Sequence, residues 1–417
     1  MLMRTPISRG SASGRSSVSL FEPRLIPMKF QPVLLLLAAA LPLGLRAADK
    51  FTVTVTHDLA AARPAETIVI PFSEVRQRIP DVLIDHVVVR DAKGKIVPAQ
   101  VTNFNPDERP AKYDELVFQH DFAAGEKTAK FTVEKTSEPV PPFPAKVFAR
   151  YVPERLDDFA WENDKVAHRM YGPGLDTPAA GKSRMISSGI DVWAKRVSYP
   201  IVDRWYLKGH DAYHTDTGEG LDLYDVGTAR GTGGLGVWDG KNLYVSANYK
   251  TWKVLANGPI RAVFELSYGT WDAAGAKVSE VKRFTVDAGH QLDCVESTFS
   301  IEGKTEVPIA IGITKHKTNG AVTKDQKDGF LSYWEQYPKD GQLGTAVVLP
   351  AGECGGFAAN SADNLILAKA VSGKPLRYYA GAAWDRAGEI ASKDAWNAYL
   401  SAWVARLNAP IRVQYSD

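Results

Sequence analysis

The chain has 417 residues, of which 45% are hydrophobic and 24% are charged, as in an ordinary folded protein. Its 34 glycines, 25 prolines and 2 cysteines exclude a collagen, a disulfide-rich scaffold and a disordered chain, each of which needs a more skewed composition. The 50 lysines and arginines against 48 aspartates and glutamates leave a formal charge of +2, so no nucleic-acid partner is expected.

The first predicted element is a secretory signal peptide at about residues 28–47. A basic start at 28–30 precedes an apolar run at 33–45, and Ala47 and Ala48 are small residues typical of a cleavage site. The run is too short to remain as a membrane-spanning anchor. We therefore separate residues 1–48, an upstream extension plus the signal peptide, from the folded protein. A periplasmic or secreted product with no membrane partner is expected.

Alternating apolar and polar residues predict a small N-terminal β-sandwich at 49–136. Residues 51–56, 84–90 and 129–133 alternate with period two, a pattern typical of half-buried antiparallel strands. Residues 137–144 follow and are rich in proline, which continues neither a helix nor a central strand. We expect this segment to be a stiff linker and a domain boundary.

Beyond the linker, the strand pattern continues and predicts one large antiparallel β-supersandwich at 145–417. Asp239 and Gly240 between β-rich flanks predict a hairpin. Further strands are expected at 261–270, 278–286, 292–301, 307–316, 345–349, 365–370, 376–384 and 411–415. The fold class is therefore all-β.

One long amphipathic helix is expected near the C-terminus, with Asp394 as its N-cap. Its apolar residues recur at helical spacing: Trp396, Tyr399, Leu400, Trp403, Val404 and Leu407. The remaining structural question concerns Cys294 and Cys354, which could pair in an oxidising compartment or remain buried free thiols.

Polar, aromatic and charged residues are concentrated between residues 159 and 248. If 166–170 is a strand, His168 and Met170 share one of its faces, whereas Arg169 and Tyr171 share the other. Further along, residues 203–206 lead into His210, Tyr213 and His214 in a predicted loop, where binding groups tend to collect. A single histidine in a strand, such as His168, is more often a hydrogen-bonded core or surface group than a catalyst.

Four carboxylates in the glycine-rich segment after this loop recur every three residues: Asp216, Glu219, Asp222 and Asp225. They could bind calcium, but their spacing matches no known calcium loop, and solvated turn residues are the favoured interpretation. The glycines near Arg230 are not followed by the Gly-Lys-Ser/Thr of a phosphate loop. A Gly-x-Ser-x-Gly elbow and a His-Glu-x-x-His motif are also missing from the sequence, which argues against a serine hydrolase and a zinc protease of those kinds.

Four strings carry a family resemblance: Trp-Glu-Asn-Asp-Lys-Val-Ala-His-Arg-Met-Tyr-Gly-Pro at 161–173, Ser-Gly-Ile-Asp-Val-Trp at 188–193, Tyr-His-Thr-Asp at 213–216 and Asn-Gly-Pro-Ile-Arg at 257–261. With them, the chain resembles the bacterial family of domain of unknown function 4861 from roughly residue 50 to residue 410. The resemblance implies a galactose-mutarotase-like β-supersandwich and a carbohydrate-active protein. It also implies a reaction class, because a member is associated with dehydration of the non-reducing-end uronic acid of ulvan oligosaccharides.

The chemistry of that reaction suggests roles for residues of this chain. Removing water across C4–C5 of a uronic acid requires a base at C5, an acid at the departing C4 hydroxyl and a cation at the carboxylate. We assign the base to His214 and the proton donor to one of Tyr213, Tyr206, Tyr171 or His168. We assign the cation to Arg204, Arg230 or Arg169, sugar-stacking faces to Trp205 and Trp161, and further substrate contacts to Glu219, Asp222 and His316.

These assignments predict an oligosaccharide dehydratase or lyase whose partner is a uronic-acid-containing oligosaccharide. The reaction requires no metal or organic cofactor, and the sequence leaves the oligomeric state open. A sugar epimerase or glycoside hydrolase on the same scaffold is the first alternative, with hydrolysis requiring two carboxylates about 5–9 Å apart. Such carboxylates could come from Glu162, Asp164, Glu219 or Asp222. A non-catalytic glycan-binding protein is the second alternative.

Overall fold

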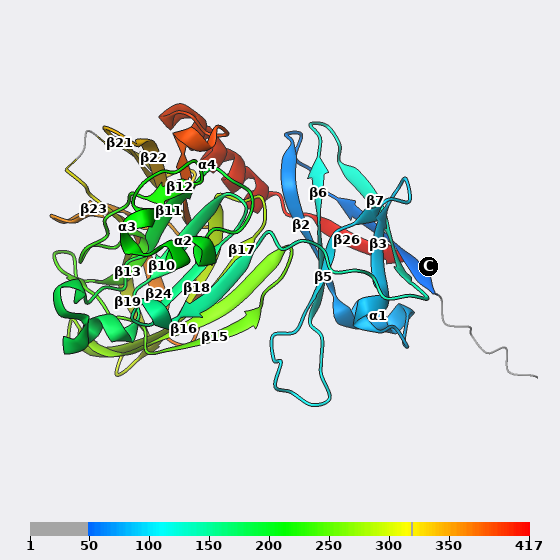
Figure 1. Cartoon of the computed structure of the whole chain (residues 1–417), viewed down its shortest axis with the longest axis horizontal. Coiled ribbons are helices and arrows are strands. Elements are labelled where there is room, and N and C mark those ends of the chain that lie inside the picture. The colour runs from blue at the N-terminus through cyan, green and yellow to red at the C-terminus, as the bar shows by residue number, and fades with distance from the viewer. Residues whose placement is uncertain (1–48, 318–319) are drawn as a thin grey trace, which may run out of the picture. The chain divides into compact units, whose positions relative to one another are not determined.

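The computed structural model describes residues 49–317 and 320–417 (Figure 1). The predicted signal peptide lies outside the described residues. Within the described part, no helix is both long and apolar enough to cross a membrane.

The N-terminal sandwich consists of two antiparallel sheets, with strand orders β26-β1-β7-β3-β4 and β2-β6-β5. Alternate residues such as Val53, Ile68, Phe118 and Phe131 are buried between them, as the period-two pattern predicts. The elements are β1 (Lys50–Thr56), β2 (Arg63–Pro71), α1 (Phe72–Arg78), β3 (Val87–Asp91), β4 (Ile96–Val97), β5 (Ala99–Thr102), β6 (Glu115–Phe122), β7 (Thr128–Lys135) and β26 (Arg412–Ser416).

Strand β26 comes from the far end of the chain. It pairs antiparallel with β1, with Val55 opposite Val413 and Val53 opposite Tyr415. The sequence pattern indicates a strand here but not its partner, because pairing over more than 300 residues leaves no local signal. The chain therefore returns to the N-terminal sandwich after completing the large domain.

The large domain contains three antiparallel sheets, which confirms the predicted all-β class (Figure 1). The first contains β8 (Phe148–Val152), β9 (Asp158–Glu162), β10 (Val166–Met170), β11 (Asp191–Lys195) and β12 (Gly220–Asp222). The second contains β13 (Thr232–Trp238), β14 (Leu243–Tyr244), β19 (Glu306–Thr314), β23 (Gly356–Ala359) and β24 (Asp363–Val371). The third has eight strands: β15 (Thr251–Ala256), β16 (Arg261–Ala273), β17 (Ala276–Asp287), β18 (Leu292–Ile301), β20 (Ala321–Asp325), β21 (Phe330–Tyr337), β22 (Gly341–Val348) and β25 (Pro375–Trp384).

The main core of the large domain lies between the eight-stranded sheet and the two five-stranded sheets. Phe264 and Phe284 of the eight-stranded sheet pack against Trp161 of β9, and the same cluster includes Ile309 and Ile311 of β19. The predicted hairpin at Asp239 is confirmed, because Val237 pairs with Tyr244 across β13 and β14.

Helix α4 (Lys393–Asn408) confirms the predicted C-terminal amphipathic helix (Figure 1). Its buried residues Trp396 and Leu400 pack in one cluster with Phe330, Trp334 and Val348 of the eight-stranded sheet. The predicted N-cap is wrong by two positions. Ser392 is the cap, and its side chain accepts a hydrogen bond from the backbone N–H of Ala395.

The predicted loop around His210, Tyr213 and His214 is also corrected, because His210–Tyr213 form a short helix, α3, which follows another short helix, α2 (Val202–Lys208). Val202 and Trp205 of α2 and Tyr213 of α3 are buried in one cluster with Trp193 of β11. These apolar side chains explain why the segment is helical and covers the outer face of the first five-stranded sheet. Cys294 and Cys354 are free thiols.

Candidate active site

Strand β10 divides the predicted residues between two faces of its sheet. It has the predicted bounds Val166–Met170, and its residues His168 and Arg169 point to opposite sides. His168 faces the core, where its ring lies 5.4 Å from that of Trp161. The guanidinium of Arg169 lies over the rings of Tyr171 and Trp193, at 5.4 and 5.3 Å from their centroids.

Arg169 is buried among three carboxylates. Its Nη2 donates to Asp191 at 2.5 Å and to Asp222 at 3.2 Å, and its Nε lies 3.9 Å from Asp158. Asp191 is the direct cross-strand partner of Arg169 in the β10–β11 pair. One positive charge thus faces three acidic groups in a site from which water is largely excluded.

The buried environment shifts the pKa values of these groups. Burial raises the pKa of Asp158 to about 7, against the opposing effect of Arg169. Burial also raises the pKa of Asp191 and of Asp222, and the nearby Asp191 carboxylate raises that of Asp222 further. Burial alone would lower the pKa of Arg169, but Asp191 and Asp222 hold it well above its usual range. The guanidinium therefore stays charged, while Asp158 is a carboxyl group that titrates near neutral pH.

The backbone beside Asp158 is strained. Leu156 and Asp157 both have positive φ, at 54° and 66°, in the left-handed region, which Asp tolerates but a residue such as Leu rarely adopts. Gly172, whose N–H donates to Asp158 at 3.1 Å, has no room for a side chain, since a Cβ there would collide with the backbone of Asp157. The close approach of these two segments fixes the position of the Asp158 carboxyl.

Several polar atoms at this site have no hydrogen-bond partner in the described part of the chain. They include the Nε and Nη1 of Arg169, the Oδ2 of Asp158 and the hydroxyl of Tyr213, and the Tyr206 hydroxyl lies beside the Arg169 guanidinium. Buried donors and acceptors are normally paired, so a group of unpaired ones requires an explanation. A ligand with complementary polar groups would satisfy them.

His214 provides the accessible edge of this site. Its Nδ1 lies 2.9 Å from the carbonyl oxygen of Asp222, and its side chain is 40% exposed. Because a carbonyl only accepts, Nδ1 carries the proton of the neutral ring, and Nε2 has the free lone pair. The ring also lies 4.8 Å from that of Tyr213. We call these residues the Arg169 cluster: Asp158, Arg169, Tyr171, Asp191, Trp193, Tyr206, Tyr213, His214 and Asp222.

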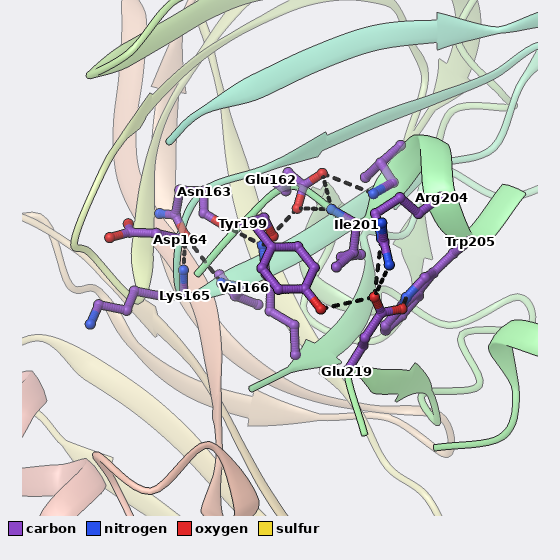
Figure 2. Close-up of polar contacts among 12 residues, drawn as sticks. Glu162, Asn163, Asp164, Lys165, Val166, Tyr199, Ile201, Arg204, Trp205 and Glu219 are labelled. Atoms are coloured by element: carbon purple, nitrogen blue, oxygen red, sulfur yellow. Dashed lines mark hydrogen bonds and ion pairs between the residues drawn. The ribbon is translucent and has the colours of Figure 1, made fainter. Parts of the chain in front are cut away.

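Two further carboxylates hold helix α2 in place. Figure 2 shows Glu219 accepting bonds from Tyr199 and Arg204, and it also accepts from the indole of Trp205 and from Lys208. Lys208 and the other donors lower the pKa of Glu219 to about 2, so Glu219 is a permanent carboxylate rather than a general acid. Its contacts link the predicted residues Arg204, Trp205 and Glu219 to each other.

At the start of α2, Glu162 accepts bonds from the backbone N–H groups of Ile201 and Val202, as Figure 2 shows for Ile201. Lys195 donates to Glu162 at 2.7 Å, and both side chains are buried. Glu162 is therefore occupied by structural contacts and is not placed to act as one of two hydrolytic carboxylates.

The predicted residues Trp161 and His168 lie on the inner face of the sheet, away from the Arg169 cluster. Trp161 donates to Asp293 at 2.7 Å, and the Nε2 of His168 lies 3.7 Å from the same carboxylate. Both rings are buried in the core. The assignments of a sugar-stacking face to Trp161 and a proton donor to His168 are therefore corrected. Trp205 is likewise buried, stacked on Trp193 at 5.4 Å, and offers no open face to a sugar.

Arg230 and His316 also lie outside the cluster. Arg230 is buried and donates hydrogen bonds to Ser188 and to the carbonyl of Thr228. Its guanidinium therefore makes structural contacts with neighbouring segments. The Nδ1 of His316 contacts Glu335 at 2.9 Å, and its Nε2 contacts the carbonyl of Asp225 at 2.6 Å. Burial lowers the pKa of His316, but the bond to Glu335 outweighs it and raises that pKa.

The interpretation of the four regularly spaced carboxylates as solvated turn residues is wrong for Glu219 and Asp222. Both are buried in the contacts described above, whereas Asp216 is a turn residue that accepts a hydrogen bond from the backbone N–H of Gly218 and pairs with Arg196. Within residues 49–317 and 320–417, no group of three His, Cys, Asp or Glu side chains is arranged to hold a metal ion.

Sequence reasoning missed Asp158 and Asp191 as members of the site. Asp191 lies in one of the four strings that carry the family resemblance, but its role depends on the register that places it opposite Arg169. A buried arginine on one strand predicts a nearby acid on the next strand, and that signal points to Asp191. Asp158 leaves no such signal, because its position depends on the strained turn before it.

Residues 55–413 match the family described as Domain of unknown function (DUF4861). A protein of Formosa agariphila named "Uncharacterized protein P7" is 33% identical over 371 residues, which cover 87% of this chain and 92% of that protein.

Two solved structures resemble the fold. An alpha-mannosidase from Enterococcus faecalis gives a TM-score of 0.46 at 10% identity, covering 88% of this chain and 46% of that one. A glycosyl hydrolase family 38 protein from the same organism gives 0.47 at 11% identity, covering 88% and 47%. The chain thus spans about half the length of these solved chains.

Proposed function

Because the chain belongs to the family described as domain of unknown function DUF4861, we propose that it is a carbohydrate-active enzyme, an oligosaccharide dehydratase. The substrate is an oligosaccharide ending in a uronic acid, and the reaction eliminates water across C4–C5 of that sugar. The reaction class comes from the family resemblance, and the choice of residues comes from the geometry of the Arg169 cluster. We also propose that the protein acts in the periplasm or outside the cell.

The observation that carries the proposal is the orientation of the His214 ring beside the phenol hydroxyls of Tyr206 and Tyr213 and the guanidinium of Arg169. The bond from Nδ1 to the Asp222 carbonyl leaves Nε2 as a basic nitrogen on a half-exposed ring. The adjacent cluster offers phenol hydroxyls on Tyr206 and Tyr213 and free N–H groups on Arg169. A base, proton donors and a cation are the three groups that this elimination requires.

The proposed step starts with removal of the C5 proton by Nε2 of His214. Charge that develops on the sugar carboxylate is stabilised by the unpaired N–H groups of Arg169. The C5–H and C4–O bonds break, the C4=C5 double bond forms, and the C4 hydroxyl leaves as water with a proton from Tyr213 or Tyr206. Solvent then returns a proton from the imidazolium to the phenolate.

A product assay tests this proposal. The mature protein is incubated with a panel of uronic-acid-ended oligosaccharides, and both ultraviolet absorbance and product mass are followed. Loss of one water together with new absorbance from the conjugated double bond is the expected result.

Other outcomes would replace the dehydratase with another activity. Chain cleavage with new absorbance would identify a lyase, and cleavage with gain of water would identify a hydrolase. An unchanged mass with an altered sugar configuration would identify an epimerase. Saturable binding without any chemical change would identify a glycan-binding protein.

A further inference from the structure

A polar groove lies between the N-terminal sandwich, the outer face of the eight-stranded sheet and helix α4. It contains a cavity of about 520 Å³ whose lining includes Arg63 of β2, Arg377 of β25 and Arg406 of α4. A second cavity of about 330 Å³ shares Glu296, Pro350 and Arg377 with the first. The two cavities therefore adjoin each other, and together we call them the seam groove. Neither cavity is lined by a residue of the Arg169 cluster.

The charge of the seam groove favours an anion. Six arginines and lysines line it against four carboxylates, which leaves an excess of two positive charges. Its one histidine, His290, is fully enclosed, and burial lowers its pKa, so it adds no charge at neutral pH. The side-chain ammonium of Lys374, which lines the smaller cavity, has no hydrogen-bond or ion-pair partner among the described residues.

Two guanidinium groups in the groove are fixed in position yet keep a free donor. Arg377 uses Nε and Nη2 to bind Glu296, at 3.1 and 2.7 Å. Arg406 uses the same two nitrogens to bind Glu66, at 3.1 and 2.8 Å. In both residues, Nη1 has no partner in the described part of the chain. Because the carboxylates already hold the guanidinium planes, a ligand that binds Nη1 orders little further side chain.

The deep end of the groove holds a buried donor without an acceptor. Trp403 lines the cavity and is about nine-tenths buried, and its indole Nε1 has no partner within the described residues. The ring of Tyr379 lies 5.6 Å from that of Trp403 in an edge-to-face arrangement and also lines the cavity. Aromatic walls with a few fixed N–H donors are the composition of a site for a polar organic ligand.

We propose that the seam groove is a second glycan-binding site, which holds an acidic sugar unit of an oligosaccharide outside the Arg169 cluster. Arg377 and Arg406 bind the carboxylate or sulfate ester of that unit, and Tyr379 and Trp403 form the wall beside its ring. That the anionic group belongs to a sugar rests on the proposed function. The preference for an anion rests on the groove itself.

The test uses the full chain labelled with 5-fluorotryptophan and observed by fluorine NMR. The resonance of Trp403 reports on the seam groove, and that of Trp193 reports on the Arg169 cluster. Each resonance is assigned from a Trp→Phe variant. The probes are tetrasaccharides of polygalacturonate, of chondroitin 4-sulfate and of cellulose, together with inorganic sulfate. We expect an acidic tetrasaccharide to shift the Trp403 resonance saturably, and cellotetraose to leave it unchanged.

Variants localise the binding. Arg377→Gln removes one charge-assisted contact and should raise the half-saturation concentration about tenfold. Arg412→Gln is the matched control, because Arg412 is also 56% exposed and also pairs with a single acid, Asp58, on the N-terminal sandwich. His214→Ala should titrate like the unmodified chain at the Trp403 resonance.

Three results would overturn the second site: no shift of Trp403 with either acidic tetrasaccharide, an equal shift with cellotetraose, or equal affinities in Arg377→Gln and Arg412→Gln. Saturation by inorganic sulfate at the same concentration as the tetrasaccharides would also overturn it, since the sugar would then contribute nothing. Turnover of a uronate substrate without a Trp403 shift would support the proposed function while rejecting the second site. A saturable Trp403 shift with acidic tetrasaccharides in a protein without turnover would support the second site while rejecting the proposed function.

Discussion

The two faces of strand β10 place similar residue types in opposite situations. On the inner face, His168 and Asp293 are enclosed by Trp161 and the core. On the outer face, Arg169 and its aspartates connect to the half-exposed His214. Burial raises the pKa of Asp293 to about 7 on one face and that of Asp158 to about 7 on the other.

A shifted pKa alone therefore does not distinguish a functional site from a structural one here. Both faces hold buried polar atoms without a partner among the described residues, and the outer face differs by having a route to solvent through His214. The variants below use this difference, and each is paired with a counterpart that tests whether the two faces behave differently.

The largest expected effect is on turnover in His214→Ala. Loss of the general base should lower the dehydration rate by about 10²–10⁴-fold, without changing the urea unfolding midpoint. His210→Ala is the matched control, because its ring lies only 4.7 Å from that of His214 and is more exposed. Normal turnover in His214→Ala, or an equal loss in His210→Ala, would refute the assignment of the base.

Arg169→Met should cause the largest loss of stability. It leaves Asp158, Asp191 and Asp222 buried without their cation, and removal of one partner from a buried ion pair costs roughly 3–5 kcal/mol. The free energy of unfolding from urea titration at pH 8 measures this loss. A change below about 1 kcal/mol would mean that these carboxyl groups are readily protonated or solvated and that the guanidinium is not needed to hold them.

Asp293→Asn should change stability in the opposite direction at high pH. The folded-state pKa of Asp293 is raised from 3.8 to about 7, so the protonated carboxyl stabilises the fold in acid, and this stabilisation is lost progressively as the pH rises from about 4 to about 7. An asparagine keeps the acceptor for Trp161 and has no proton to lose. The variant should match the unmodified protein near pH 4 and exceed it at pH 8 by roughly 4 kcal/mol at most.

Thermal or urea unfolding across pH 4–8 measures the effect of Asp293→Asn. Parallel stability curves for the two proteins would show that Asp293 titrates normally. A lower stability of the variant at pH 8 would show that the inner face requires the charged carboxylate.

The smallest expected effect comes from removing single hydroxyl groups. Tyr213 and Tyr268 both have buried hydroxyls without a partner among the described residues, the first in the Arg169 cluster and the second in the main core. Tyr213→Phe should lower turnover about tenfold, since Tyr206 can still donate a proton. Tyr268→Phe should leave turnover unchanged, and both variants should keep their unfolding midpoints within experimental error. Equal turnover in the two variants would remove Tyr213 from the mechanism.

Much of the fold could be predicted from local sequence. Period-two alternation identified strands such as β18, and helical spacing identified α4. The pattern failed at α2 and α3, because burial of Trp205 and Tyr213 against Trp193 depends on a contact with a distant strand. It also could not assign β26 to β1, since no local feature encodes such a pairing.

The site was predictable where it depends on residue type and alternation. Alternation along the predicted strand correctly places His168 and Arg169 on opposite faces of the sheet. The structure brings five of the predicted residues together: Arg169, Tyr206, Tyr213, His214 and Asp222. It could not predict that Trp161 and Trp205 are enclosed, because aromatic residues suit both a core and a sugar platform. It also missed Asp158, whose position depends on the left-handed turn at Leu156 and Asp157.

The partnership of β26 with β1 has a consequence for biogenesis. During synthesis β1 emerges long before β26, so one edge of β1 stays open until residues 412–416 are available. A nascent or prematurely terminated chain therefore exposes backbone amides that invite association with other extended polypeptides. Quality-control factors that recognise unfinished sheets would find their target at β1, although the missing strand is β26.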